Sequence, residues 1–193
     1  MENIYQTPSD IRHRIWMELG RATQDRHHAW RTPVLATAAE DGLPDARTVV
    51  LRDADANTAH LRFYTDGRSA KVSQLSDRPD AMLVFWSKRL NWQLRVRVSI
   101  TVQAAGPLVE SVWARVGRSA AAGDYLSPFV PGTILSAASP SDALTTAAPS
   151  TDPLRHHLVV LDAQVQDIDW LELARGGHRR ARLRADTWEW LTP

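Results

Sequence analysis

The chain has 193 residues, of which 44% are hydrophobic and 23% charged, and its formal net charge is +1. This balance is typical of a soluble globular protein and excludes wholesale disorder. The near-neutral charge gives no support to nucleic-acid binding. Because no cysteine is present, disulfides, thiolate nucleophiles and thiolate metal sites are excluded. The length suits one sizeable core, so we expect a single domain over residues 1–193.

Targeting and metal-binding signals are also missing from the sequence. The first ten residues lack a basic segment followed by an apolar stretch, and no run approaches the roughly 20 apolar residues that span a bilayer. We therefore expect a cytoplasmic protein without a membrane partner. His27 with His28, and His156 with His157, form adjacent pairs. Adjacent residues on a strand point to opposite faces, so we expect no metal site.

Residues 1–30 are predicted to form an N-terminal helix and its lead-in. Ser9 or Asp10 can cap this helix, and Gly20 is a plausible stop. Between them the apolar residues recur at helical spacing and form one stripe, made of Ile11, Ile15, Trp16 and Leu19.

A run of strands follows the helix. Residues 33–39 and 46–52 are predicted to pair as a hairpin around the turn at 40–42, whose Gly42 accepts a positive φ. After a polar turn at 53–60, residues 61–65 form a third strand. Residues 69–75 allow one short helix, and 81–86 read as a buried strand. Strict alternation over 93–102 then predicts a long strand with one face in a core.

The second half is less regular. Pro107 sits where a helix would begin, with Leu108, Val112 and Val116 on its inner side. Residues 136–152 are rich in Ala, Ser, Pro and Thr, and we expect a mobile loop or an excursion onto a neighbouring molecule. Strand character resumes over 157–173, and 179–184 with 187–193 suit a closing hairpin. Six or seven strands with short turns and a few helices predict a mainly β fold, an antiparallel barrel.

Basic and hydroxyl side chains gather around the second strand and the turn after the third. Arg47, Arg68, Ser69 and Lys71 supply guanidinium, ammonium and hydroxyl donors, and Ser69 opens a helix. A phosphate monoester carries nearly two negative charges and needs such donors together. The alternative is that these are solvated surface charges. The grouping favours a phosphate.

Several longer stretches resemble the pyridoxamine 5'-phosphate oxidase family of FMN-binding split barrels. They are "TPVLATAAEDGLPDARTVVLRD", "FYTDGRSAKVSQLSDRPDAMLVFW" and "QLRVRVSITV", and they cover residues 32–102 in order. The likeness returns weakly over 165–193, with a terminal "W...LTP". The resemblance implies a six-stranded antiparallel split barrel with flanking helices. It also implies a homodimer in which FMN lies between the two subunits.

The resemblance further implies roles for matching residues. Arg47, Ser69 and Lys71 would bind the FMN phosphate, and Arg68 would replace the family arginine whose position is Ala70 here. Gln93 would read the pyrimidine edge of the flavin. Arg180, or Arg182 if a residue is inserted, would stabilise the reduced ring. Further contacts would come from the strand "RTVVLR" and the next strand, through Thr48, Val49, Val50, Leu51, Arg52, Tyr64 and Thr65.

The substrate end departs from the family pattern. Arg52 stands in place of the family lysine that approaches the substrate, and Trp113, Arg115, Arg118 and Ser119 replace its phosphate-gripping set with related chemistry. The resemblance leaves Arg52, Arg118 and His178 as substrate-binding candidates. The ring-packing tryptophan of the family corresponds to Trp170 or Leu171.

The resemblance predicts an FMN-dependent oxidoreductase in which a small amine or alcohol gives hydride to the flavin. Two other interpretations stay open. One is a flavin- or haem-binding or sensing protein without turnover. The other is a reductase that uses NAD(P)H or deazaflavin.

Overall fold

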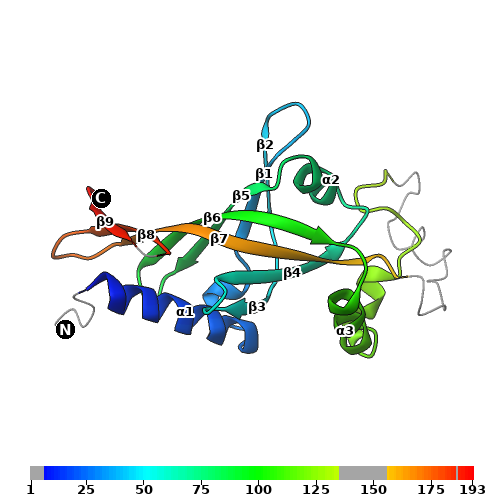
Figure 1. Cartoon of the computed structure of the whole chain (residues 1–193), viewed down its shortest axis with the longest axis horizontal. Coiled ribbons are helices and arrows are strands. Elements are labelled where there is room, and N and C mark those ends of the chain that lie inside the picture. Colours follow the sequence, from blue (N-terminus) through cyan, green and yellow to red (C-terminus); the bar gives the residue numbers. More distant parts are fainter. Residues whose placement is uncertain (1–6, 135–155, 186) are drawn as a thin grey trace.

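The computed structural model describes residues 7–134, 156–185 and 187–193, and within them the chain is mainly β with flanking helices (Figure 1). The described strands are β1 (Val34–Ala38), β2 (Pro44–Thr48), β3 (Leu51–Asp55), β4 (His60–Asp66), β5 (Asp80–Ser87), β6 (Trp92–Gln103), β7 (Leu158–Glu172), β8 (Arg179–Arg184) and β9 (Trp188–Leu191). The helices are α1 (Pro8–Gln24), α2 (Ala70–Asp77) and α3 (Pro107–Val116). Two 3-10 turns, Ala29–Arg31 and Ala120–Tyr125, complete the elements.

All strand pairs are antiparallel, in the order β2-β1-β5-β6-β7-β4-β3, and β8 and β9 extend the sheet beyond β7. The predicted fold class is therefore confirmed. The described residues contain nine strands instead of six or seven, partly because the strand predicted over 46–52 divides into β2 and β3. The chain changes partner there: β2 pairs with β1, in a register that the bond of 3.0 Å from the Val49 amide to the Pro33 carbonyl continues, whereas β3 pairs with β4. The loop predicted over 136–152 lies outside the described residues.

Helix α1 is longer than predicted at both ends. Its cap is Thr7, and Asp10 forms the reciprocal half of a capping box, so the prediction of Ser9 or Asp10 as the cap was wrong. The helix also runs past Gly20, because one glycine costs only about 1 kcal/mol. Its last turn is held by Arg31, which donates to the carbonyls of Ala22 at 3.0 Å and Thr23 at 2.8 Å.

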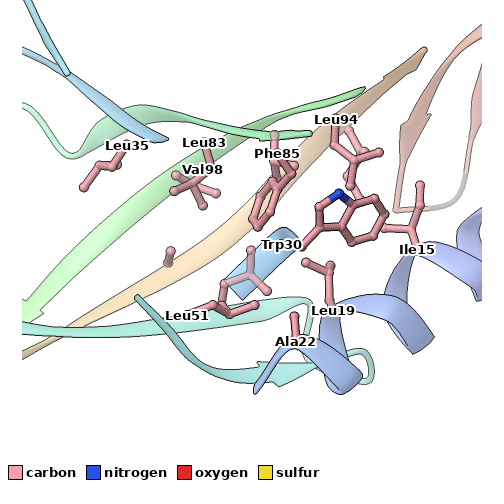
Figure 2. Packing of buried hydrophobic residues seen from close by; sticks show 14 of the residues in the cluster. Ile15, Leu19, Ala22, Trp30, Leu35, Leu51, Leu83, Phe85, Leu94 and Val98 are labelled. Carbon is pink, nitrogen blue, oxygen red and sulfur yellow. The ribbon is translucent and has the colours of Figure 1, made fainter. Parts of the chain in front are cut away.

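One hydrophobic core joins α1 to the concave face of the sheet (Figure 2). Trp30, fully buried, lies between Ile15 and Leu19 of α1 and Phe85 of β5, with its ring 6.0 Å from that of Phe85. A smaller cluster under α3 contains Val109, Val112, Tyr125, Leu158 and Val160. The remaining faces of the sheet are therefore free to carry polar groups.

The described helices include none that combines the length and apolarity needed to cross a membrane.

Candidate functional site: two cationic clusters beside β4

Arg47 projects from β2 toward α2. Its Nη1 donates to the buried Thr37 hydroxyl at 2.6 Å, and its Nη2 donates to Gln74 Oε1 at 3.2 Å and pairs with Asp45. The side chain is about one-fifth exposed. Arg47 is therefore held in a fixed position at the edge of the core, with part of its guanidinium facing solvent.

Lys71, in the first turn of α2, completes a group that we name the Arg47–Lys71 cluster (Arg47, Thr65, Ser69 and Lys71). Its Nζ donates to Thr65 Oγ1 at 3.1 Å and Ser69 Oγ at 3.0 Å. Burial and, after it, the positive charge of Arg47 lower the pKa of Lys71. A bound phosphate would reverse this effect, because a dianion stabilises both cations.

The start of α2 adds backbone donors to the cluster. Ser69 is the N-cap residue, but its hydroxyl donates to the Asp66 carbonyl at 2.8 Å and does not cap the helix. The Val72 amide donates to the Ser69 carbonyl at 2.8 Å, so the amides of Ala70 and Lys71 are the ones that can serve an anion. The turn is packed closely against β7, since a Cβ on Gly67 would lie 2.8 Å from Val159 Cγ1. Cations, hydroxyls and amides in one place fit the phosphate of FMN.

Arg68 lies in the same turn but serves another purpose. Its guanidinium donates two hydrogen bonds, of 3.0 and 2.7 Å, to the carboxylate of the buried Asp66. It also donates to the carbonyls of Ser127 at 2.8 Å and Phe129 at 3.1 Å. Burial raises the pKa of Asp66, but the bonds from Arg68 outweigh it and the pKa is lowered. Because these partners occupy its guanidinium, we leave Arg68 out of the proposed phosphate site.

Changing Arg68 to alanine is expected to lower the free energy of unfolding by about 2 kcal/mol, because Asp66 would stay buried without its cation. The effect on FMN affinity should be smaller than that of Arg47→Ala. Urea unfolding and flavin titration of the same variant measure both quantities. If the variant had normal stability and strongly reduced FMN affinity, this result would show that Arg68 does bind the FMN phosphate.

A second cationic group surrounds Tyr64, the neighbour of Thr65 on β4. Arg52 is the extra residue of a bulge between Leu51 and Asp53, and its Cζ lies 5.8 Å from the Tyr64 ring centre. Bulges re-aim side chains in this way. Arg115 of α3 donates to the Tyr64 hydroxyl at 2.8 Å. A pocket of about 350 Å³ opens here, lined by Thr23, Gln24, Arg31, Arg52, Tyr64, Arg115, Val116, Ser119 and Ala121.

Sequence reasoning missed the contribution of α1 to this Tyr64 pocket. Thr23 and Gln24 of its last turn line the pocket, together with Arg31 of the 3-10 turn that follows. The helix was predicted to end at Gly20, so nothing placed its last turn there. Two predicted substrate residues do not line the pocket. Arg118 is exposed beyond α3, and His178 lies in the β7–β8 turn, where its Nδ1 accepts a bond of 3.3 Å from the Ala174 amide.

Gln93 and Arg180 lie together on the outer face of the sheet. Both pair with Leu171 of β7, from β6 and β8 respectively. Trp170, the other candidate for ring packing, is fully buried, with its ring 5.2 Å from that of Trp92. Leu171 is therefore the one of the two that shares a face with Gln93 and Arg180.

The Arg47–Lys71 cluster lies on the opposite face. The register runs from Arg47 through Leu35 and Leu83 to Val96, so these four residues share one face. Gln93 is three residues from Val96 on the same strand and points the other way. The structure thus does not bring all predicted cofactor residues together within one chain.

The remaining predicted contacts fall between these groups. Thr48 ends β2 and is exposed, while Val49 and Val50 are half-buried outside any strand. Leu51 is fully buried in the core, so only its backbone could face a ligand. No group of three or more His, Asp or Glu side chains that could hold a metal ion occurs among the described residues.

Comparisons with known proteins agree with this picture. Residues 13–104 match the family model described as pyridoxamine 5'-phosphate oxidase, FMN-binding domain. A pyridoxine/pyridoxamine 5'-phosphate oxidase of Maricaulis maris is 47% identical over 72 residues, which are 37% of this chain and 32% of the relative. A second oxidase of the same name, from Salinibacter ruber, is 40% identical over 94 residues, which are 49% of this chain and 42% of the relative. The matches thus span less than half of these relatives' own lengths.

Two crystal structures share the fold over the whole chain. A pyridoxamine 5'-phosphate oxidase-related, FMN-binding protein of Nostoc punctiforme superposes with a TM-score of 0.72 and 25% identity, covering 100% of both chains. PhzG of Burkholderia lata superposes with a TM-score of 0.69 and 18% sequence identity, covering 100% of this chain and 98% of the PhzG chain. An identity this low is evidence for the fold alone. Residues 13–104 are therefore similar to the FMN-binding domain of the pyridoxamine 5'-phosphate oxidase family, and the whole chain shares the fold of these two structures.

Proposed function

We propose that the protein is an FMN-dependent oxidoreductase acting on a small amine or alcohol. The observation that carries this proposal is the Arg47–Lys71 cluster at the start of α2, where two cations, two hydroxyls and free helix amides converge. This donor set suits a phosphate monoester. The match to an FMN-binding domain supports the choice of FMN as the ester.

The chain would bind and orient the cofactor with groups on both faces of the sheet. The Arg47–Lys71 cluster would hold the phosphate, and the Gln93 amide, which both donates and accepts, suits the pyrimidine edge of the ring. Arg180 would balance negative charge on that edge. Bound FMN supplies the hydride chemistry. Because Gln93 and Arg180 lie on the face opposite the cluster, we propose a homodimer in which each flavin meets residues of both copies.

The Tyr64 pocket is the proposed substrate site. Arg31, Arg52 and Arg115 give it positive charge, and Tyr64 and Ser119 add hydroxyls. This lining suits a substrate with a phosphate or carboxylate group. Tyr64 and Thr65 are consecutive residues of β4, so the substrate pocket and the phosphate cluster border adjacent positions of the same strand.

Two absorption measurements test the proposal. The protein incubated with FMN and freed of excess ligand should show a bound flavin spectrum, and anaerobic addition of pyridoxamine 5'-phosphate, or of another small amine or alcohol, should bleach it. Protein that stays colourless contradicts FMN binding. Bound flavin that is bleached only by NAD(P)H or reduced deazaflavin would indicate a reductase, and flavin that no donor bleaches would indicate a binding or sensing protein.

A further inference from the structure

Arginines line both sides of two aspartates on the outer face of the sheet. Asp167 and Asp169 of β7 lie between β6 and β8. In the register, Arg97 and Arg184 pair with Asp167, while Arg95 and Arg182 pair with Asp169. Directly paired residues point to the same face. Together with Met82 and Arg180 these residues line a cleft of about 160 Å³, which we name the arginine cleft.

The two aspartates do not neutralise the five arginines. Asp169 is mostly used by Arg180, which binds it with two bonds of 2.9 and 2.7 Å, and Arg95 lies 3.6 Å from it. In line with this, the bonds from Arg180 lower the pKa of Asp169. Asp169 therefore balances most of the charge of Arg180 and part of that of Arg95. The excess of positive charge must come from the other three arginines.

Arg97, Arg182 and Arg184 are weakly paired. Arg97 Nε lies 3.9 Å from Asp167, beyond hydrogen-bond distance, and Arg184 reaches only the exposed Glu189 at 3.4 Å. Arg182 is half-buried and attracts Asp169 through its charge, but it forms no hydrogen bond or close ion pair with any residue that the structure describes. Placing like charges side by side on a sheet is unfavourable. A ligand that brings negative charge would remove this cost.

The spacing of the arginines indicates the size of that ligand. Residues two apart on a strand are roughly 6.6 Å apart, and strands on either side of a common neighbour are roughly 9.5 Å apart. Long arginine side chains leaning over β7 from both sides can reach the same small anion. A phosphate or diphosphate group fits this frame and the cleft volume, and planar guanidinium forks match its oxygens.

We propose that the arginine cleft is a second anion-binding site that takes a phosphate or diphosphate group of a small molecule, through Arg97, Arg182 and Arg184. It is distinct from the Arg47–Lys71 cluster, because the register places the two on opposite faces of the sheet. Arg180 lines the cleft and is also proposed to meet the flavin of the second copy, so the cleft borders the proposed flavin site and its ligand binding must be measured with and without FMN.

Inorganic pyrophosphate is the probe for a calorimetric titration at low ionic strength, with FMN-saturated protein so that the Arg47–Lys71 cluster is filled. We expect pyrophosphate to bind at one further site per chain. Its affinity should fall at least about tenfold in the double variant Arg97→Ala, Arg182→Ala, because charge-assisted hydrogen bonds are lost. Salt at 0.5 M should weaken it as well. Arg26→Ala, which removes an exposed arginine on another surface, is the matched control and should leave binding unchanged.

The same titration in the variant Arg47→Ala, Lys71→Met separates this site from the proposed flavin site. Retained pyrophosphate binding there supports the arginine cleft even if the protein does not take FMN. Repeating it with ADP identifies the source, because tighter binding of ADP than of pyrophosphate indicates a nucleotide. No further binding, binding that survives loss of Arg97 and Arg182, or a double variant that changes only the oligomeric state, would overturn the proposal.

Discussion

Replacing Glu18 by glutamine is expected to lower the free energy of unfolding by about 3 kcal/mol. Glu18 is fully buried on α1, and its carboxylate accepts from His28 Nε2 at 2.8 Å and Arg89 Nη2 at 2.7 Å, with Arg14 beside it. These partners join α1 to the 3-10 turn that follows it and to the loop between β5 and β6. Glutamine keeps the volume but removes the charge that offsets Arg14 and Arg89. Urea unfolding followed by tryptophan fluorescence measures the loss.

The pH dependence of stability provides a second readout for Glu18. Burial raises its pKa, but the bonds from His28 and Arg89 and the nearby charges outweigh burial and lower it. A carboxyl with a lowered folded pKa stabilises the fold above its unfolded value, near 4.5, and this contribution is lost as pH falls through the folded pKa. The wild-type protein should therefore lose more stability below pH 4.5 than Glu18→Gln does.

The exposed Glu40 supplies the control. Glu40→Gln should change the free energy of unfolding by less than about 0.5 kcal/mol. If Glu18→Gln behaved like Glu40→Gln, the Glu18 cluster would not contribute to stability, and the attachment of α1 would depend on its apolar stripe alone.

The regular parts of the fold could be predicted because their signals are local. The residues whose alternation over 93–102 predicted a long strand form the central strand β6. Gly42 has a positive φ, as predicted, with a value of 83°. The errors arose where distant residues decide. Helix α1 continues past Gly20, where Arg31 satisfies its last carbonyls. The strand over 46–52 divides because its first part pairs with β1 and its second part with β4. Neither Arg31 nor β4 can be identified as a partner from the local pattern.

The candidate site divides in the same way. Arg47, Ser69 and Lys71, three of the four residues in the predicted grouping, lie together, and Thr65 joins them. Arg68 carries the same charge in the same turn, but the buried Asp66 beside it is its partner. Burial of a carboxylate depends on tertiary packing, so a sequence alone does not show which of two neighbouring cations is already used.

The change Arg47→Ala is expected to weaken FMN binding by about 2–5 kcal/mol, because the phosphate would lose a positioned and partly buried charge partner. Titration of the protein with FMN, followed by quenching of flavin fluorescence, measures the affinity. Arg78→Ala, an exposed arginine just beyond the end of α2, is the matched control and should bind FMN normally. A loss below about 0.5 kcal/mol in Arg47→Ala would show that the anion lies elsewhere.

Arg47 also bonds to Thr37 and Gln74, so a loss of affinity in Arg47→Ala alone could follow from a disturbed fold. Lys71→Met resolves this ambiguity. Methionine retains an apolar stem while removing the ammonium, and it also removes the repulsion by which Arg47 contributes to the lowered pKa of Lys71. The free energy of unfolding without FMN should therefore stay the same or rise, while FMN affinity falls by at least tenfold. A ligand site is the only arrangement in which these two quantities move apart, because a purely structural lysine would lower both.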